Sequence, residues 1–211
     1  MTPQNIYIVG AQCTGKTTLV NALEAHYKAN EPPEGQPAII KEVARTVLVQ
    51  YSFTAHDITS STERCLALQK LILQVQLREE KRALESGAQW FISDRSGIDP
   101  IAYALQYVGQ EGANVLLGSP EWAELKKRMQ ASLIVVCEAG VSWLRDDGVR
   151  LMPANTEEWG EFHELFCALL RREGLAFVTL SRAISDISER VQASVGAVGA
   201  ASNHTVNQPL D

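Results

Sequence analysis

Strand-length apolar runs alternate along the chain with segments whose apolar residues recur at helical spacing. Five such runs lie at residues 5–9, 38–43, 88–94, 132–138 and 175–181. Their nearly unbroken apolar character is typical of strands buried on both faces of a parallel sheet. The segments of helical spacing include residues 16–29, 44–51, 62–85, 120–130 and 156–173. This order predicts a three-layer α/β/α domain with a mainly parallel five-stranded sheet.

Polar and turn-forming residues divide the rest of the chain. Residues 52–60 form a predicted polar loop, and Asp99 with Pro100 looks like the N-cap and first-turn proline of a further helix. We assign residues 1–182 to one domain and residues 183–197 to a C-terminal helix that packs on it. The small and polar residues 198–211 are expected to be a disordered tail.

Four residues suited to ligand binding fall at or just after predicted strand ends. They are Gly10, Glu42, Asp94 and Glu138. In an open parallel sheet, ligands bind beyond the carboxyl ends of the strands. We therefore expect one crevice to collect these positions.

Residues 10–17 read GAQCTGKT, a G-x-x-x-x-G-K-T phosphate-binding pattern placed between a predicted strand and a predicted helix. Backbone N–H groups of such a loop and the N-terminus of the next helix bind phosphate. Lys16 is expected to reach the β- and γ-phosphates, and the Thr17 hydroxyl to bind Mg²⁺. The predicted ATP-binding residues of this loop are Gly10, Ala11, Gln12, Cys13, Thr14, Gly15, Lys16, Thr17 and Thr18.

Cys13 allows two interpretations. A thiol near a helix N-terminus has a lowered pKa and can be redox-active. The simpler interpretation is a small residue that the loop tolerates.

Asp94 ends the third apolar run, and Arg95 and Ser96 follow it. Asp94 is expected to hold Mg²⁺ together with Thr17, whereas hydrolytic motors often have a second acid directly after this position. An arginine there suits stabilisation of charge that moves from ATP to an acceptor hydroxyl. The alternative is an Asp-Arg surface pair at a helix entrance.

Glu42 lies at the end of the second run and is a candidate to accept the proton of the acceptor hydroxyl or to orient that hydroxyl. Arg45 lies three residues later, so a local ion pair on a helix is the alternative. Asp99 is interpreted as a helix cap in preference to a ligand.

Residues 139–155 have no clean period and are predicted to form a lid that closes over bound nucleotide and excludes water. Arg150 is the first candidate to reach the transferred phosphoryl group, and Arg145 is a second, nucleotide-binding candidate. A solvated loop with Arg-Asp pairs is the alternative.

Net charge, hydropathy and cysteine placement restrict the kinds of partner and the cell compartment that we expect for this protein. The formal net charge of −6 argues against nucleic acid, whose binding depends on clustered Lys and Arg. No apolar run approaches membrane-spanning length. The four cysteines are widely separated, which favours a reduced, cytoplasmic chain. The oligomeric state cannot be predicted.

Together these motifs resemble the AAA-like P-loop family that includes the ribosylnicotinamide kinase domain of bacterial NAD-biosynthesis regulators. The matching stretches are GAQCTGKTTL, EVAR, ISDRS with DPIAYA, and WLRDDGVR, in the expected order. The resemblance implies a nucleoside-kinase-like enzyme with Glu42 as base or hydroxyl-orienting residue, Asp94 as magnesium partner, Arg95 as phosphate or acceptor contact and Arg150 as lid residue. No clear aromatic clamp for nicotinamide is found, and no adenylyltransferase half accompanies the domain. Ribosylnicotinamide is therefore one candidate acceptor among several.

The expected function is ATP- and Mg²⁺-dependent phosphoryl transfer to a hydroxyl of a nucleoside-like or other small metabolite. The alternatives are a nucleotide-dependent switch or binding module and a simple ATPase. The chain has no N-K-x-D guanine-specificity motif, which weakens a Ras-like switch.

Overall fold

The computed structural model describes residues 4–141 and 155–204, and its centre is a five-stranded parallel sheet. The strands are β1 (Ile6–Val9), β2 (Ala38–Ile40), β3 (Phe91–Asp94), β4 (Leu133–Cys137) and β5 (Val178–Leu180). Their order across the sheet is β2-β3-β1-β4-β5, and all neighbouring pairs are parallel. The predicted fold class is confirmed.

Side chains of each central strand alternate between two hydrophobic cores, as the pleat of a strand requires. In β1, Tyr7 and Val9 point into one core and Ile6 and Ile8 into the other. All four are buried. The apolar runs are unbroken because both faces of the sheet are covered.

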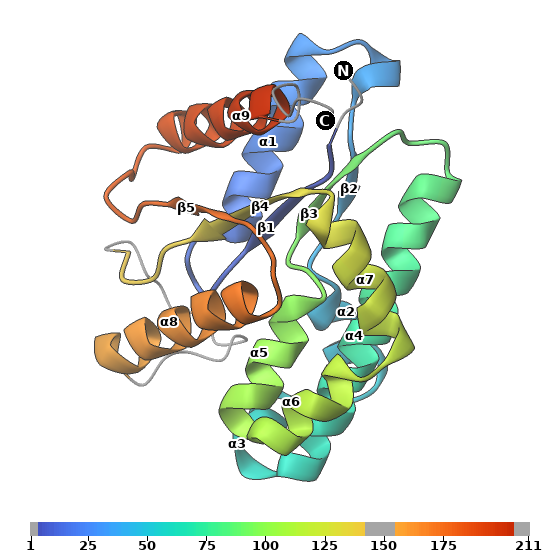
Figure 1. Ribbon diagram of the computed structural model, residues 1–211, viewed down its shortest axis with the longest axis vertical. Coiled ribbons are helices and arrows are strands. Elements are labelled where there is room, and N and C mark those ends of the chain that lie inside the picture. The colour runs from blue at the N-terminus through green and yellow to red at the C-terminus, as the bar shows by residue number, and fades with distance from the viewer. Residues whose placement is uncertain (1–3, 142–154, 205–211) are drawn as a thin grey trace, which may run out of the picture.

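Helices form the two outer layers (Figure 1). The smaller core lies under α1 (Lys16–Asn30) and α9 (Ile187–His204). The larger core lies under the remaining α-helices, which are α2 (Val43–Gln50), α3 (Ala55–Ser60), α4 (Thr62–Glu85), α5 (Ile98–Tyr107), α6 (Gln110–Leu117), α7 (Pro120–Gln130) and α8 (Thr156–Arg172). A short 3₁₀ helix, η1, spans Pro33–Gly35.

The predicted polar loop at 52–60 is wrong in its second half, because α3 occupies Ala55–Ser60. Thr54 caps this helix, and its backbone N–H donates to Asp57 in return, at 2.8 Å. This T-x-x-D capping box was the sequence signal for the helix. The short α6 was not predicted either.

Two predicted boundaries near the strand ends also differ. β2 ends at Ile40, because the chain turns at Glu42, which is the N-cap residue of α2. Helix α5 begins at Ile98, so Asp99 is not its N-cap residue as predicted. The Asp99 carboxylate instead accepts hydrogen bonds from the backbone N–H and hydroxyl of Ser96, at 2.8 and 2.9 Å, from within the first turn.

The C-terminal helix is longer than predicted. We expected it to end near residue 197, but α9 continues to His204. Residues 198–204, predicted to belong to a disordered tail, are therefore helical. Among the residues that the structure describes, no helix is long and apolar enough to cross a membrane.

Candidate active site

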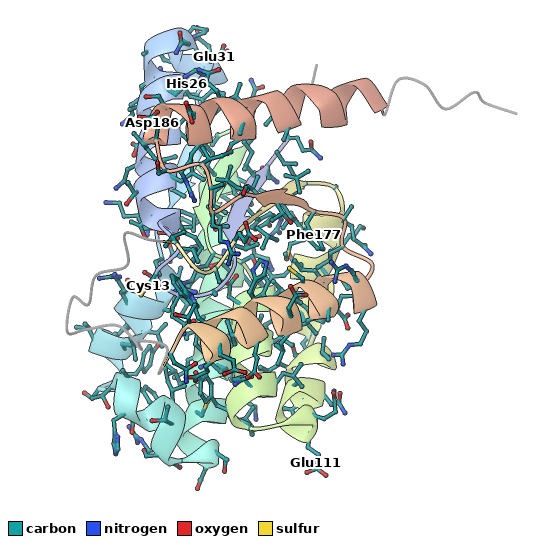
Figure 2. The ribbon with its side chains drawn as sticks, turned by 90° about the vertical axis from the view of Figure 1, so that its left-hand side faces the viewer. Cys13, His26, Glu31, Glu111, Phe177 and Asp186 are labelled. Atoms are coloured by element: carbon teal, nitrogen blue, oxygen red, sulfur yellow. The ribbon has the colours of Figure 1, made fainter. Side chains whose placement is uncertain are left out.

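The phosphate-binding pattern forms the loop between β1 and α1, in which Figure 2 labels Cys13. Three of its residues have positive φ: Gly10 at 120°, Cys13 at 61° and Gly15 at 81°. A Cβ on Gly10 would lie 2.8 Å from the carbonyl oxygen of Cys137 in β4. Glycine is needed there because two backbones meet and because the conformation is left-handed.

Side chains from three later helices hold this loop. The indole Nε1 of Trp159 in α8 donates to the carbonyl of Gln12 at 2.9 Å. The guanidinium of Arg190 in α9 donates to the carbonyl of Thr14 at 3.2 Å. Tyr103 in α5 donates to the side-chain oxygen of Gln12 at 3.4 Å. Our reading of the sequence missed all three supports, since each lies far along the chain in an ordinary helical pattern.

Lys16 is buried at the start of α1. Its ammonium donates to the carbonyl of Ala11 at 2.5 Å and to the hydroxyl of Thr14 at 3.4 Å. Burial lowers the pKa of Lys16 to about 8, and the positive charge of Arg95 contributes to that fall. An added negative charge at this loop would favour the charged ammonium, as expected of a phosphate-binding lysine.

The side chains of Thr17, in the first turn of α1, and Asp94, at the carboxyl end of β3, face each other. The Thr17 hydroxyl donates to Asp94 Oδ2 at 2.6 Å. The other carboxylate oxygen, Oδ1, is buried and has no hydrogen-bond partner in the described part of the chain. A hydroxyl and a carboxylate are hard oxygen donors of the kind that Mg²⁺ prefers. These two side chains therefore fit the predicted magnesium site.

Glu42, Arg95 and Asp99 form an ion-pair cluster beside the phosphate loop. Arg95 Nε lies 2.7 Å from Glu42 Oε1, and one terminal nitrogen lies 3.4 Å from Asp99 Oδ1. Arg45 Nε lies 2.8 Å from the other Glu42 oxygen. The ion pair expected between Glu42 and Arg45 is therefore present, but the same carboxylate also binds Arg95.

Arg95 has an unusual backbone conformation, with φ at 80°. Its backbone N–H donates to the carbonyl of Ile8 at 3.0 Å, so the strand next to it fixes that conformation. Strained backbone of this kind occurs where the surrounding structure holds a functional side chain in place.

The environment of Glu42 determines its protonation. Burial raises the pKa of Glu42, but the guanidinium groups of Arg95 and Arg45 and the ammonium of Lys16 outweigh burial and bring it to about 2. A carboxylate with so low a pKa is a weak base. This geometry suits orientation of a hydroxyl better than abstraction of its proton.

A pocket joins this cluster to the phosphate loop. Gln12 lines it on the loop side, and Glu42, Arg95 and Asp99 line it on the sheet side. Its other walls are mostly apolar and come from α2, α3, α4 and α5, through Val43, Leu48, Ile58, Leu68, Ile72 and Pro100. The pocket combines a charged end beside the loop with an apolar body, as is typical of small-molecule sites.

The remaining predicted positions are Thr18, Glu138, Arg145 and Arg150. Thr18 is exposed on α1. Glu138 follows β4 as predicted, but its carboxylate accepts the backbone N–H of Arg182 at 2.8 Å and so holds the turn after β5. Arg145, Arg150 and residues 142–154 of the predicted lid lie outside the described residues.

Solved structures with the same fold include two of NadR and one of shikimate kinase. The NadR protein in complex with NR is 23% identical with a TM-score of 0.67, and the match covers 92% of this chain and 52% of that chain. NadR in complex with NAD and AMP-PNP is 20% identical with a TM-score of 0.63, covering 100% of this chain and 51% of that chain. Shikimate kinase from Acinetobacter baumannii, in complex with shikimate, is 14% identical with a TM-score of 0.55, covering 94% of each chain.

The chain thus spans about half the length of the two NadR structures. No curated protein sequence matches it. At these identities the structures establish a P-loop kinase-like fold. A family model described as an AAA domain matches residues 5–190, and the chain therefore belongs to that family.

Proposed function

We propose that the protein is a kinase that uses ATP and Mg²⁺ to phosphorylate a hydroxyl of a nucleoside-like or other small metabolite. The observation that carries this proposal is the pocket in which Glu42, Arg95 and Asp99 stand beside Gln12 of the phosphate loop. A site for hydrolysis alone does not need an apolar pocket next to the nucleotide. A transfer site does, because it must bind an acceptor and exclude water.

Each side chain has a role in this mechanism. Lys16 and the loop N–H groups bind the β- and γ-phosphates of ATP. Thr17 and Asp94 would hold Mg²⁺, which would supply positive charge to neutralise the phosphate oxygens. Arg150, in the predicted lid, remains a proposed contact of the moving phosphoryl group, and Arg145 a proposed contact of the nucleotide.

Glu42 and Arg95 act on the acceptor side. The Glu42 carboxylate accepts a hydrogen bond from the acceptor hydroxyl and directs its oxygen at the γ-phosphorus. The new O–P bond forms as the bond from the γ-phosphorus to ADP breaks, and the hydroxyl proton passes to an oxygen of the transferred phosphoryl group. Phosphoryl transfer through a loose transition state needs positioning and charge stabilisation more than a strong base. The low pKa of Glu42 is compatible with that requirement. Arg95 is proposed to stabilise the equatorial oxygens of the phosphoryl group as it moves.

The nucleotides and small molecules named with the related structures support the same class of acceptor. NR is bound to one NadR structure, AMP-PNP to the other, and shikimate to shikimate kinase. NR suits a nucleoside-like acceptor, and shikimate suits a smaller hydroxyl-bearing metabolite. Ribosylnicotinamide remains one candidate among several.

The test is ADP release with and without an acceptor panel, combined with mass analysis for phosphorylated product. The panel contains adenosine, cytidine, ribosylnicotinamide and shikimate. We expect ADP release to rise with at least one acceptor and that acceptor to gain one phosphoryl group. ADP release that never depends on an added compound, with no phosphorylated product, would instead indicate a simple ATPase or a switch.

A further inference from the structure

One buried amide at the pocket has an unsatisfied hydrogen-bonding atom. Gln76 lies in α4 and is fully buried, and its side chain lines the pocket. Its Oε1 is buried and accepts no hydrogen bond from any described residue. Buried polar atoms in folded proteins nearly always have partners, so this exception calls for a ligand or ordered water.

The orientation of this amide is set by a buried polar network. Gln76 Nε2 donates to Glu80 Oε1 at 2.9 Å and to the Ser93 hydroxyl at 3.0 Å. The other oxygen of Glu80 accepts from Arg128 at 2.5 Å and from Tyr7 at 2.9 Å. Burial raises the pKa of Glu80, and its hydrogen bond from Gln76 and its ion pair with Arg128 oppose that rise. In this ion pair the Glu80 oxygens act as acceptors, and one of them faces the Gln76 amide nitrogen.

Rotating the amide would place its oxygen against the Glu80 carboxylate, where two acceptors would repel each other. Both N–H groups of Gln76 are therefore committed to Glu80 and Ser93. The remaining oxygen is the only group that the amide can offer to the pocket. It accepts hydrogen bonds and donates none.

The surroundings restrict which donor can meet this oxygen. The pocket walls from α4 are apolar at Leu68 and Ile72, and Gln69 is a second polar but uncharged side chain there. A charged donor would have to lose its hydration against these walls, which is costly without a paired opposite charge. A neutral N–H or O–H group satisfies the oxygen without that cost.

We propose that Gln76 is a specificity-determining residue whose Oε1 accepts a hydrogen bond from a neutral donor of a nucleoside acceptor. This inference rests on the proposed function, because it concerns the acceptor of that same site. The donor is either an amino group of the base or a hydroxyl of the sugar. Both present the same chemistry to a carbonyl oxygen, so deletion of each group distinguishes them.

The test is calorimetric binding of adenosine and three analogues, with a non-hydrolysable ATP analogue saturating the donor site. Purine riboside lacks the 6-amino group, and 2′-deoxyadenosine and 3′-deoxyadenosine each lack one hydroxyl. Cytidine and its 4-deamino analogue repeat the base comparison in a smaller ring. We expect one deletion to weaken binding to the wild type about tenfold or more, since it leaves a buried acceptor unpaired.

The variant Gln76→Met removes the acceptor and keeps the length of the side chain. In the wild type, one analogue is expected to bind more weakly than its parent nucleoside. We expect Gln76→Met to bind these two compounds with affinities within about twofold of each other. Gln74→Met, an exposed position on the same helix, should keep the wild-type ratio. A purely structural role of Gln76 would weaken every compound alike and leave the ratio unchanged.

Three results would overturn the inference. The wild type binds neither the adenosine nor the cytidine series, no analogue binds the wild type more weakly than its parent nucleoside, or Gln76→Met keeps the wild-type ratio of the two affinities. If Gln76→Met does not fold, the wild-type series decides alone. A product formed only from shikimate would keep the proposed kinase function and remove this inference. Binding that depends on one deleted group, without any phosphorylated product, would keep this inference and remove the proposed kinase function.

Discussion

The two halves of the candidate site are built in different ways. The phosphate side is a continuous stretch of backbone, residues 10–17, whose glycines and left-handed turns create the binding surface. The acceptor side has no such stretch. It consists of Glu42, Arg95 and side chains from α2, α3, α4 and α5 that meet only in the folded chain. Under the proposed function, the first half would bind nucleotides in general and the second would carry the selectivity for the acceptor.

If this division is correct, substitutions on the phosphate side abolish every nucleotide-dependent reaction, including slow hydrolysis. Substitutions on the acceptor side should reduce transfer and leave nucleotide binding intact. The following predictions test the division in order of decreasing effect.

Lys16→Ala should have the largest effect. Loss of the ammonium proposed to contact the β- and γ-phosphates should lower turnover by about 100-fold or more, with or without an acceptor. Steady-state ADP release measures this. Lys28→Ala, an exposed lysine on the same helix, is the control and should behave as the wild type.

The lowered pKa of Lys16 makes the same residue testable by pH. With a pKa of about 8 in the folded protein, the unfolded chain binds more protons between about pH 8 and 10.4. The free energy of unfolding contributed by this group should therefore rise over that range in nucleotide-free protein. Lys16→Ala should lack this rise, and a variant with an unchanged pH dependence contradicts the assignment.

Asp94→Asn should come next. The substitution removes a negative charge from the proposed magnesium site, where Thr17 donates to Asp94. We expect turnover to fall by about 30- to 100-fold and the Mg²⁺ concentration for half-maximal rate to increase. Asp186→Asn, at an exposed helix cap, is the matched control. An unchanged Mg²⁺ requirement would contradict a metal-binding role.

Glu42→Gln should separate the two halves. We expect acceptor-dependent transfer to fall about tenfold while the dissociation constant for ATP stays within about twofold. Glu63→Gln, exposed on α4, serves as control. Equal losses of transfer and of ATP affinity would show that the division is wrong at this residue.

The pKa of Glu42 adds an acid-stability test. It is lowered from an ordinary value of about 4.3 to about 2 in the folded protein. The stabilisation is therefore present above about pH 4.3 and is lost as the pH falls towards 2. Denaturation at pH 6 and pH 3 should show a smaller loss for Glu42→Gln than for the wild type.

Arg190→Met should have the smallest effect. It removes the donor to the Thr14 carbonyl without touching the proposed substrates. We expect the KM for ATP to rise about fivefold, with kcat changed less than twofold, because loop order is affected more than chemistry. Arg172→Met, at an exposed position, should change neither value. A large fall in kcat would mean that Arg190 acts on the reaction itself.

The two halves also differ in how well the sequence predicts them. The spacing of Gly10, Gly15, Lys16 and Thr17 specifies a loop, and the apolar run before Asp94 specifies a buried strand. Local rules therefore predicted the phosphate side and the five-stranded sheet. Glu42 and Arg95 were recognised as candidates because each lies at or just after the end of a predicted strand.

These local rules did not predict the acceptor pocket. Gln76 sits in a helix whose boundaries were predicted correctly, but its partners Glu80, Ser93 and Arg128 are combined by helix packing. Trp159 and Arg190 likewise reach the phosphate loop from far along the chain. Their roles depend on long-range geometry, which periodicity does not encode.

The contact between Arg190 and the Thr14 carbonyl also orders events during synthesis. These residues are 176 positions apart, and at roughly 5–20 residues per second the ribosome needs roughly 10–35 s to pass from one to the other. A nascent chain that already contains the complete phosphate-binding motif still lacks the guanidinium that steadies it. Under the proposed function, full affinity for nucleotide is therefore expected only after the C-terminal helix has been translated and docked.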